Sequence, residues 1–482
     1  MSLWGAEFDL QETKKETKKL LKKVEKPKEA SLVVSKTVKS KKVSIEEKLA
    51  VIYAEVRRIL GVYAEKTVVL RSREELHKYI DKAIENKVIA IDTETNNSLD
   101  PITCKLMGPC IYTPGQKNAY IPVNHIDIKT GELLPNQVTE QDVYEEFQRL
   151  KGTQIITHNG KFDYEVLKCT TGYEMPIYWD TYIGARILNE NERAGLKQQY
   201  IEKIDPSIEK YDIEHLFSGV EYAQVDPEIF ALYAATDAYM TYRLYKEYQL
   251  PIFMQEDSKK LYYVFRNIEM PLVEVLAEME LAGVCLDLDY AQRLSLHYHK
   301  LLDEKDQEIE IELKKYEDKI SSWRLTKEAN EHPTNKRGNS TSIGKSKNEQ
   351  LENPVNLSSP TQLAIFIYDI LKKPVVDEKS PRGTGEDIIA KFEDKIFQLI
   401  LDRRGLLKLI NTYVDALPEA VNKDTGRIYA HFLQIGADTG RLSSQSPNLQ
   451  NVPSHKKDIR LLFKAAPGNV IVGGDFSLRN VG

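Results

Sequence analysis

Carboxylates at three separate places in the sequence could together hold divalent metal ions. The first pair, Asp92 and Glu94, stands two residues apart at the end of the apolar run Ile89–Ile91. Alternate residues of a strand point to the same face, so both carboxylates would lie together there. Two close carboxylates repel one another unless a cation lies between them, and Mg²⁺ prefers such oxygen ligands. Alone the pair is a weak signal, because a strand end facing solvent has the same pattern.

Two later segments supply more carboxylates. Asp163 ends the motif Thr157–Asp163 (THNGKFD) just before an expected helix, where an N-cap is the ordinary interpretation. Tyr233 and Asp237 are four residues apart on another expected helix, so both would face the same way. Alone, this second pattern would be explained by a buried Tyr beside a surface carboxylate.

Taken together, the order and content of these segments resemble the DEDD class of 3′–5′ exonucleases, in the subtype that uses Tyr. The resemblance implies an RNase H-like α/β fold and two metal ions, Mg²⁺ by expectation, with Mn²⁺ also suited to carboxylates. One ion would activate water and the other would stabilise the leaving 3′ oxygen. The implied metal ligands are Asp92, Glu94, Asp163 and Asp237.

The same resemblance assigns roles to three neighbouring side chains. Tyr233 would orient the attacking water, since a phenol with a pKa near about 10 is a poor general base. Asn159 would lie near the terminal nucleotide, and Phe162 would lie in the core.

A second block, near the C-terminus, resembles family A DNA polymerases. Thr439–Ser444 and Pro447–Asn451 are similar to the family's segment that lines the duplex near the primer end, and Glu269–Asp287 is similar to the helix that joins exonuclease and thumb. Arginine forks and side-chain amides suit minor-groove and phosphate contacts. The implied DNA-binding residues are Arg441, Asn448, Gln450 and Asn451, with Arg404 and Lys408 as further phosphate contacts. Without the resemblance, a polar surface loop and packed amphipathic helices would explain these segments.

Asp475 resembles the first catalytic carboxylate of the polymerase palm and would also be a metal ligand. The match is lost after Ser477, before the family's fingers and its second palm carboxylate. We therefore expect a proofreading exonuclease (a hydrolase) and DNA-binding part of a nucleotidyltransferase, with no DNA synthesis from this chain alone. An intron or intein, a split gene with a second chain carrying the fingers and remaining palm, or a degraded gene would each account for the loss. The alternative function is a non-catalytic DNA-binding or assembly subunit of a split polymerase.

Between these residues the pattern is first α/β and then helical. Short apolar runs predict strands at Val68–Leu70, Val88–Ile91, Lys117–Val123, Gln154–Ile156 and Gly468–Phe476. Helical spacing predicts helices at Glu74–Asn86, Tyr164–Cys169, Thr181–Asn189, Pro227–Leu250, Ile268–Ala282, Ala291–Ile320, Thr361–Leu371, Gly385–Phe392 and Asp394–Leu417. Interleaved strands and helices indicate an α/β domain with a mixed sheet and flanking helices.

These elements predict four parts. Residues 1–61 would form a lysine-rich flexible tail and lead-in helix, and 62–250 the exonuclease domain. Residues 251–420 would form a mainly helical thumb, with an exposed polar insertion near 321–354. Residues 421–482 would form an incomplete, truncated α+β palm.

Composition and charge set the class of protein. The hydrophobic fraction is 41% and the charged fraction 29%, as in soluble globular proteins. Residues 14–42 hold 12 lysines and 3 glutamates, a net charge of +9. Because the whole chain has a net charge of −6, the rest of the chain has a net charge of −15. Local basic grooves, rather than net charge, would then bind a DNA primer–template and single-stranded 3′ ends.

Location and source are also expectations from composition. No apolar run approaches the roughly 20 residues that span a bilayer, and no signal peptide is evident. We therefore expect no membrane partner and a cytoplasmic protein, in the host cytoplasm if a phage encodes it. The lysine-rich composition and the thumb insertion favour a phage-like source.

Overall fold

The computed structural model describes residues 44–207, 217–331, 351–436 and 440–474. The described residues form two compact units. The first comprises the chain up to Ala282 together with Phe432–Ser443, and the second comprises Gly283–His431 and the chain from Ser444 onward. The predicted lysine-rich tail and Asp475 lie outside the described residues. The predicted domain bounds stay predictions.

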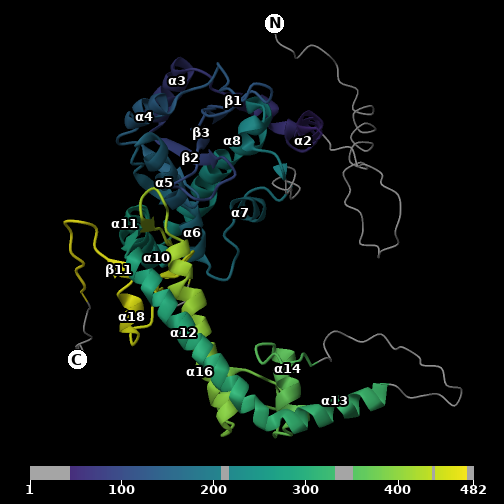
Figure 1. Ribbon diagram of the computed structural model, residues 1–482. Coiled ribbons are helices and arrows are strands. Elements are labelled where there is room, and N and C mark those ends of the chain that lie inside the picture. Colours follow the sequence, from purple (N-terminus) through teal and green to yellow (C-terminus); the bar gives the residue numbers. More distant parts are fainter. Residues whose placement is uncertain (1–43, 208–216, 332–350, 437–439, 475–482) are drawn as a thin grey trace, which may run out of the picture. The chain divides into compact units, whose positions relative to one another are not determined.

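A six-stranded mixed sheet forms the centre of the first unit (Figure 1). Its strand order is β1-β4-β3-β2-β5-β6. The β1/β4, β2/β5 and β5/β6 pairs are parallel, whereas β3 is antiparallel to both β2 and β4. The strands are β1 (Thr67–Val69), β2 (Val88–Thr95), β3 (Leu106–Tyr112), β4 (Asn118–Tyr120), β5 (Gln154–Thr157) and β6 (Ile177–Asp180). The predicted mixed sheet is confirmed.

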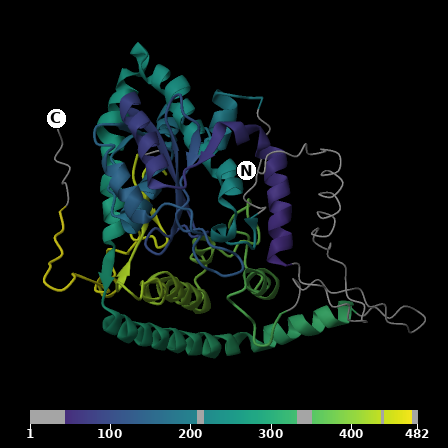
Figure 2. The same cartoon turned by 90° about the horizontal axis from the view of Figure 1, so that it is seen from above.

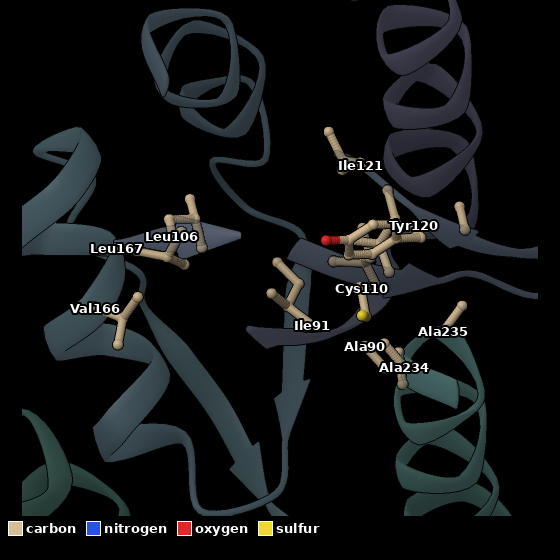
Figure 3. Packing of buried hydrophobic residues seen from close by; sticks show 14 of the residues in the cluster. Ala90, Ile91, Leu106, Cys110, Tyr120, Ile121, Val166, Leu167, Ala234 and Ala235 are labelled. Carbon is tan, nitrogen blue, oxygen red and sulfur yellow. The ribbon is translucent and has the colours of Figure 1, made fainter. Parts of the chain in front are cut away.

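The first unit also contains helices. They are α2 (Ile45–Leu60), α3 (Arg73–Asn86), α4 (Glu140–Gln148), α5 (Gly160–Thr171), α6 (Thr181–Leu188), α7 (Leu196–Lys203), α8 (Pro227–Arg243), α9 (Leu250–Phe253), α10 (Lys259–Val264) and α11 (Met270–Ala282). Of these, α3, α5, α6, α8 and α11 contact the strands of the sheet. Figure 3 shows that α5 and α8 pack from opposite sides, with Leu167 of α5 near Leu106 and Ala234 of α8 near Ala90. The central strands are therefore buried on both faces, which explains the continuous apolar run that precedes Asp92.

Local sequence signals set the starts of the helices that carry the site. Asp226 caps α8 by accepting a hydrogen bond from Glu228 N at 2.8 Å, and Pro227 occupies the first turn, where no backbone donor is needed. Asn159 precedes α5 with a left-handed φ of 63°. Asn tolerates this conformation better than most residues do, so the chain can turn sharply from β5 into α5.

The second unit is mainly helical. Its helices are α12 (Leu288–Leu313), α13 (Glu317–Glu331), α14 (Pro360–Ala364), α15 (Glu386–Ile389), α16 (Lys395–Leu409), α17 (Ala416–Glu419) and α18 (Lys457–Arg460). The long helix α12 packs along α16 (Figure 1), and α13 follows it (Figure 2). A small antiparallel sheet has the order β11-β7-β8, formed by β7 (Val284–Leu286), β8 (Arg427–Ile428) and β11 (Phe463–Lys464). Two further short strands, β9 (His431–Leu433) and β10 (Ser443–Gln445), pair with one another and include residues of the first unit. The predicted helical region is confirmed.

Several elements differ from their predictions in the first unit. The sequence patterns predict neither β3 nor β6. The strand β3 contains Gly108 and Pro109, residue types that normally argue against a strand. Helix α5 begins at Gly160 rather than Tyr164, so Asp163 lies inside its first turn and is not an N-cap.

One prediction for the second unit is wrong. The polar insertion near 321–354 stays a prediction, and its first residues belong to α13, which continues to Glu331. The expected strand Gly468–Phe476 is not a strand over the described residues 468–474. There the side chains of Val470 and Val472 are 82% and 86% exposed, and β-branched residues form a strand only where they pair and pack.

Among the residues that the structure describes, no helix is both long and apolar enough to cross a membrane.

Candidate functional site

Strand β2 presents Asp92 and Glu94 on one face of the sheet, as their spacing predicts. In the antiparallel register with β3, Asp92 lies opposite Cys110 and Glu94 lies opposite Gly108. Residues directly opposite in such a pair project to the same face. One ligand atom from each of Asp92, Glu94 and Cys110 lies within 4.8 Å of the others.

Asp163 joins this group through hydrogen bonds to β2. Its Oδ1 accepts from the backbone N–H of Thr93 at 2.7 Å and from the Thr93 hydroxyl at 2.6 Å. The carboxylate is buried, and α5 packs directly against β2. Thr93 therefore sets the position of the carboxylate on α5 relative to the two carboxylates on β2.

A second buried carboxylate, Asp180, shapes the turn from β5 into α5. Its Oδ1 accepts from the N–H of Asn159 at 3.1 Å, and its Oδ2 accepts from the N–H of Gly160 at 2.7 Å. The same side chain caps α6. At Gly160 a Cβ atom would lie 2.2 Å from the Thr157 hydroxyl oxygen, so the turn needs glycine. Asp180 and Gly160 thus fix where α5 begins and where Asp163 lies.

Helix α8 supplies Tyr233 and Asp237, and Lys197 of α7 lies beside both. The Lys197 Nζ is 3.6 Å from Asp237 Oδ2 and 4.8 Å from the centroid of the Tyr233 ring. The Tyr233 ring is buried against Phe217 and Phe230, with centroids 5.4 and 5.9 Å apart. The ring is therefore fixed by packing on its apolar sides, next to a cation.

The four carboxylates share one electrostatic environment. Burial, followed by the charges of Asp163, Glu94 and Asp237, raises the pKa of Asp92 well above its usual range, while Lys197 opposes the shift. Burial raises the pKa of Asp163 to about 7, against the hydrogen bonds from Thr93. Such mutual repulsion among hard oxygen donors is relieved by a divalent cation, so the donor set fits Mg²⁺ or Mn²⁺. Of the four predicted carboxylates, Asp92 and Glu94 lie together on β2, Asp163 is hydrogen-bonded to the residue between them, and the charge of Asp237 acts on Asp92.

Cys110 belongs to the same environment. Burial, and then the charges of Glu94, Asp92, Asp237 and Asp163, raise the pKa of its thiol. Its side chain is fully buried.

Among the remaining predicted residues of the first unit, Asn159 and Arg441 are exposed and Phe162 is partly buried. Asn159 is exposed at the turn into α5, so a nucleotide could reach it. Phe162 packs against the core rather than lying fully within it.

The other DNA-binding candidates lie in the second unit. Arg404 and Lys408 are four residues apart on α16, hence on one face. The Arg404 guanidinium is partly buried and donates to the backbone oxygen of Thr384 at 2.6 Å, whereas Lys408 is exposed. One N–H group of the Arg404 guanidinium is therefore already engaged within the protein, and its other N–H groups remain as donors to DNA.

Asn448, Gln450 and Asn451 form a single exposed turn. The Asn448 Oδ1 accepts from the N–H groups of Gln450 and Asn451 at 3.0 and 3.3 Å. The Tyr413 hydroxyl donates to the backbone oxygen of Asn451. These bonds fix the turn while the side-chain amides of Gln450 and Asn451 face solvent.

Sequence reasoning missed four residues of the site: Thr93, Cys110, Asp180 and Lys197. The Asp-Thr-Glu order could have indicated Thr93, whose backbone lies between the two carboxylates. Nothing in the local pattern distinguishes Lys197 from other helical lysines. Cys110 and Asp180 follow from strand pairing, and the two strands concerned, β3 and β6, were not predicted.

Two family models match the chain. The model described as 3′-5′ exonuclease matches residues 67–251, a range that contains all four carboxylates and Tyr233. The model described as DNA polymerase family A matches residues 327–479, a range that contains the DNA-binding candidates of the second unit and Arg441.

Curated relatives match across both ranges. DNA polymerase I of Chloroflexus aurantiacus is 31% identical over 409 residues, covering 80% of this chain and 38% of that protein. DNA polymerase I of Borreliella burgdorferi is 28% identical over 417 residues, covering 84% and 40%. The chain therefore spans about two fifths of the length of these relatives. The predicted phage-like source is not tested by these matches and stays a prediction.

A solved structure shares the fold. It is described as the POL domain of Pol1 from M. smegmatis in complex with DNA primer-template and dNTP. The TM-score is 0.57 at 21% identity, and the match covers 83% of this chain and 59% of that one.

Proposed function

The chain belongs to the family A DNA polymerases and carries their 3′-5′ exonuclease domain, and from this premise we propose that residues 67–251 remove nucleotides from DNA 3′ ends. The observation that carries the proposal is the position of Asp92 and Glu94 together on β2, with Asp163 of α5 hydrogen-bonded to the Thr93 between them and the charge of Asp237 of α8 acting on Asp92. The reaction would be hydrolysis of the terminal phosphodiester.

The metal requirement follows from the donor set. Asp92, Glu94, Asp163 and Asp237 would hold two divalent ions, with Mg²⁺ the resident ion and Mn²⁺ a substitute. When bound, such ions activate water and stabilise the leaving oxygen. Thr93 would keep Asp163 in place, because it donates two hydrogen bonds to one oxygen of that carboxylate.

The neighbouring side chains would position the reactants. Tyr233, whose ring is fixed by packing, would orient the attacking water through its hydroxyl. Lys197 would hold Asp237 and offset part of the negative charge that the scissile phosphate adds. Asn159, exposed at the turn into α5, would contact the terminal nucleotide.

We further propose that the region matching the polymerase family binds the DNA primer–template. The shared fold with a primer–template complex and the exposed turn at Gln450 and Asn451 support this part. In the second unit, Lys408 and Arg404 would contact phosphates, and Asn448 would hold the turn that presents Gln450 and Asn451. Arg441 of the first unit would be a separate DNA contact. Asp475 would be a metal ligand of the polymerase palm. Because the relatives are bacterial DNA polymerases, we propose that the protein acts in the cytoplasm.

The test uses the full chain on a 5′-labelled primer–template with a mismatched 3′ end, in Mg²⁺, with and without nucleotides. Stepwise shortening is expected, with loss of activity in EDTA. Asp92→Ala should abolish shortening and leave DNA binding intact, whereas Glu132→Ala, an exposed carboxylate of the same unit, should shorten the primer at the wild-type rate. Shortening by Asp92→Ala at the wild-type rate would overturn the metal assignment. Binding of primer–template without any shortening would instead favour the non-catalytic subunit.

A further inference from the structure

A thiol lies among the carboxylates of the proposed metal site. Cys110 is directly opposite Asp92 on the neighbouring strand, and its Sγ lies within 4.8 Å of a ligand oxygen of both Asp92 and Glu94. Strand pairing fixes this placement, because opposed residues of an antiparallel pair project to the same face. Figure 3 shows the Cys110 sulfur on the side of the sheet that faces Ala234 and Ala235 of α8, the helix that also carries Asp237.

The thiol differs chemically from every other donor at this site. Carboxylate oxygens are hard ligands that suit Mg²⁺ and Mn²⁺, whereas a thiolate is a soft ligand that selects ions such as Zn²⁺ and Cd²⁺. Zn²⁺ accepts both Cys thiolate and Asp or Glu carboxylate ligands. A buried Cys is most often a small apolar side chain, so its position among acidic ligands is the distinguishing observation.

We propose that Cys110 is an additional ligand at this site, through which the site binds a soft divalent ion such as Cd²⁺ or Zn²⁺ together with Asp92 and Glu94. The proposal rests on the proposed function, because it concerns the same carboxylates. On binding, the S–H bond breaks and a sulfur–metal bond forms with the sulfur electron pair. The thiol proton passes to solvent, and no oxidation or reduction takes place.

The consequence is a site with two classes of cation. Hard ions would use oxygen ligands alone, whereas a soft ion would gain a bond from sulfur and exchange more slowly. Micromolar Cd²⁺ or Zn²⁺ would then compete with millimolar Mg²⁺, although Mg²⁺ suits the carboxylates.

The experiment titrates Cd²⁺ into a chain whose other thiols have been removed by Cys104→Ser, Cys169→Ser and Cys285→Ser, since these are the remaining cysteines. Two quantities are measured: the ultraviolet charge-transfer absorption of a thiolate–cadmium bond and the protons released. The expected result is the absorption band with stoichiometric Cd²⁺ and one more proton released than in the same chain with Cys110→Ser. Affinity should fall by at least about tenfold in that variant, the lower end of what loss of a supporting group does to a metal site.

Two controls keep the outcomes distinct. Asp92→Asn in the same background should weaken Cd²⁺ binding, and a band that persists there with unchanged affinity would overturn the shared site. If the chain with three cysteines replaced fails to fold, the comparison is made between the wild-type chain and its single Cys110→Ser variant, which should lack the absorption band of the thiolate–cadmium bond. Mg²⁺-dependent primer shortening is measured in parallel. Shortening without any Cys110-dependent band overturns the Cys110 proposal alone, whereas absence of Asp92-dependent shortening overturns the proposed function.

Discussion

At the scale of single residues, the site depends on groups that hold the carboxylates as much as on the carboxylates themselves. Thr93 lies between Asp92 and Glu94 on β2, and both its backbone N–H and its hydroxyl donate to Asp163 of α5. One short segment therefore supplies two metal ligands and positions a third. Such supporting groups typically change metal affinity or activity by about 10–100-fold when removed.

Replacing Thr93 tests this role. Thr93→Val keeps the shape of the side chain and the backbone donor but removes the hydroxyl that donates to Asp163. We expect a rate of primer shortening about tenfold lower and a higher Mg²⁺ concentration at half-maximal rate. Thr95→Val is the matched control, because the Thr95 hydroxyl donates to the backbone oxygen of Ser98. An unchanged Mg²⁺ dependence for Thr93→Val would show that the backbone N–H alone holds Asp163.

At the scale of elements, the starting point of α5 decides where Asp163 lies. The turn from β5 packs so closely that a Cβ on Gly160 would overlap the Thr157 side chain, and Asp180 accepts hydrogen bonds from the backbone N–H groups of Asn159 and Gly160. A helix is a rigid element, so a shift at its first residue moves every side chain of its first turn. The sequence predicts this helix four residues too late because the glycine resembles a helix breaker.

Gly160→Ala should therefore affect both stability and activity. Overpacking a buried turn destabilises by about 1–3 kcal/mol, and displacement of α5 should lower primer shortening further than the loss of folded protein explains. Gly61→Ala is the matched control, because a Cβ there meets nothing within 4 Å and φ is −56°. The two readouts are the denaturation midpoint and the shortening rate under conditions where both variants are folded. Wild-type activity in folded Gly160→Ala would show that the turn tolerates the shift.

At the scale of the whole molecule, the fold of the first unit buries charge and polarity that unfolding would expose to water. His125 is fully buried between Tyr120 and Val225, and its ring packs 5.6 Å from the ring of Phe230 on α8. Its Nδ1 lies 3.0 Å from the Val225 oxygen and its Nε2 lies 2.6 Å from the Tyr120 hydroxyl. A neutral imidazole satisfies both contacts by donating from Nδ1 and accepting at Nε2. Burial lowers the pKa of His125 to about 4.

This pKa predicts a pH dependence of stability. The unfolded chain takes up a proton at His125 near pH 6.5, whereas the folded chain does so only near about 4. Stability from this group is therefore present above the unfolded pKa and is lost as pH falls through this window, by roughly 3 kcal/mol at most. His125→Gln, which cannot titrate, should show a flatter fall in the free energy of unfolding between pH 6.5 and 4. His297→Gln, an exposed histidine, should retain the wild-type slope, and equal slopes in all three proteins would contradict the assignment.

The carboxylate cluster also predicts a response of the whole fold to metal. Since the charges of Asp163, Glu94 and Asp237 act against that of Asp92, Mg²⁺ should raise the thermal midpoint and EDTA should reverse the rise. Asp92→Asn should be more stable than the wild type without metal, because one repelling charge is gone, and should gain less from Mg²⁺. The measurement is a thermal melt at several Mg²⁺ concentrations. If Mg²⁺ raised the thermal midpoint of Asp92→Asn as much as that of the wild type, the ion would bind away from Asp92.

The sequence by itself determined the residue types and their local spacing. Alternation on β2 puts Asp92 and Glu94 on one face, and helical spacing does the same for Tyr233 and Asp237, because these periods depend only on the backbone. The predicted mixed sheet and helical region are confirmed for the same reason. Capping signals such as Asp226 followed by Pro227 also act within a few residues.

Only the tertiary structure decided which distant groups meet. Lys197 reaches Asp237, Asp180 reaches the turn before α5, and Cys110 meets Asp92 through contacts between residues far apart in the chain. Local patterns carry no signal for such pairs, because strand order and register are set by burial of the whole sheet. The expected strand at Gly468–Phe476 shows the converse, since an apolar run without a partner among the described residues does not form a strand.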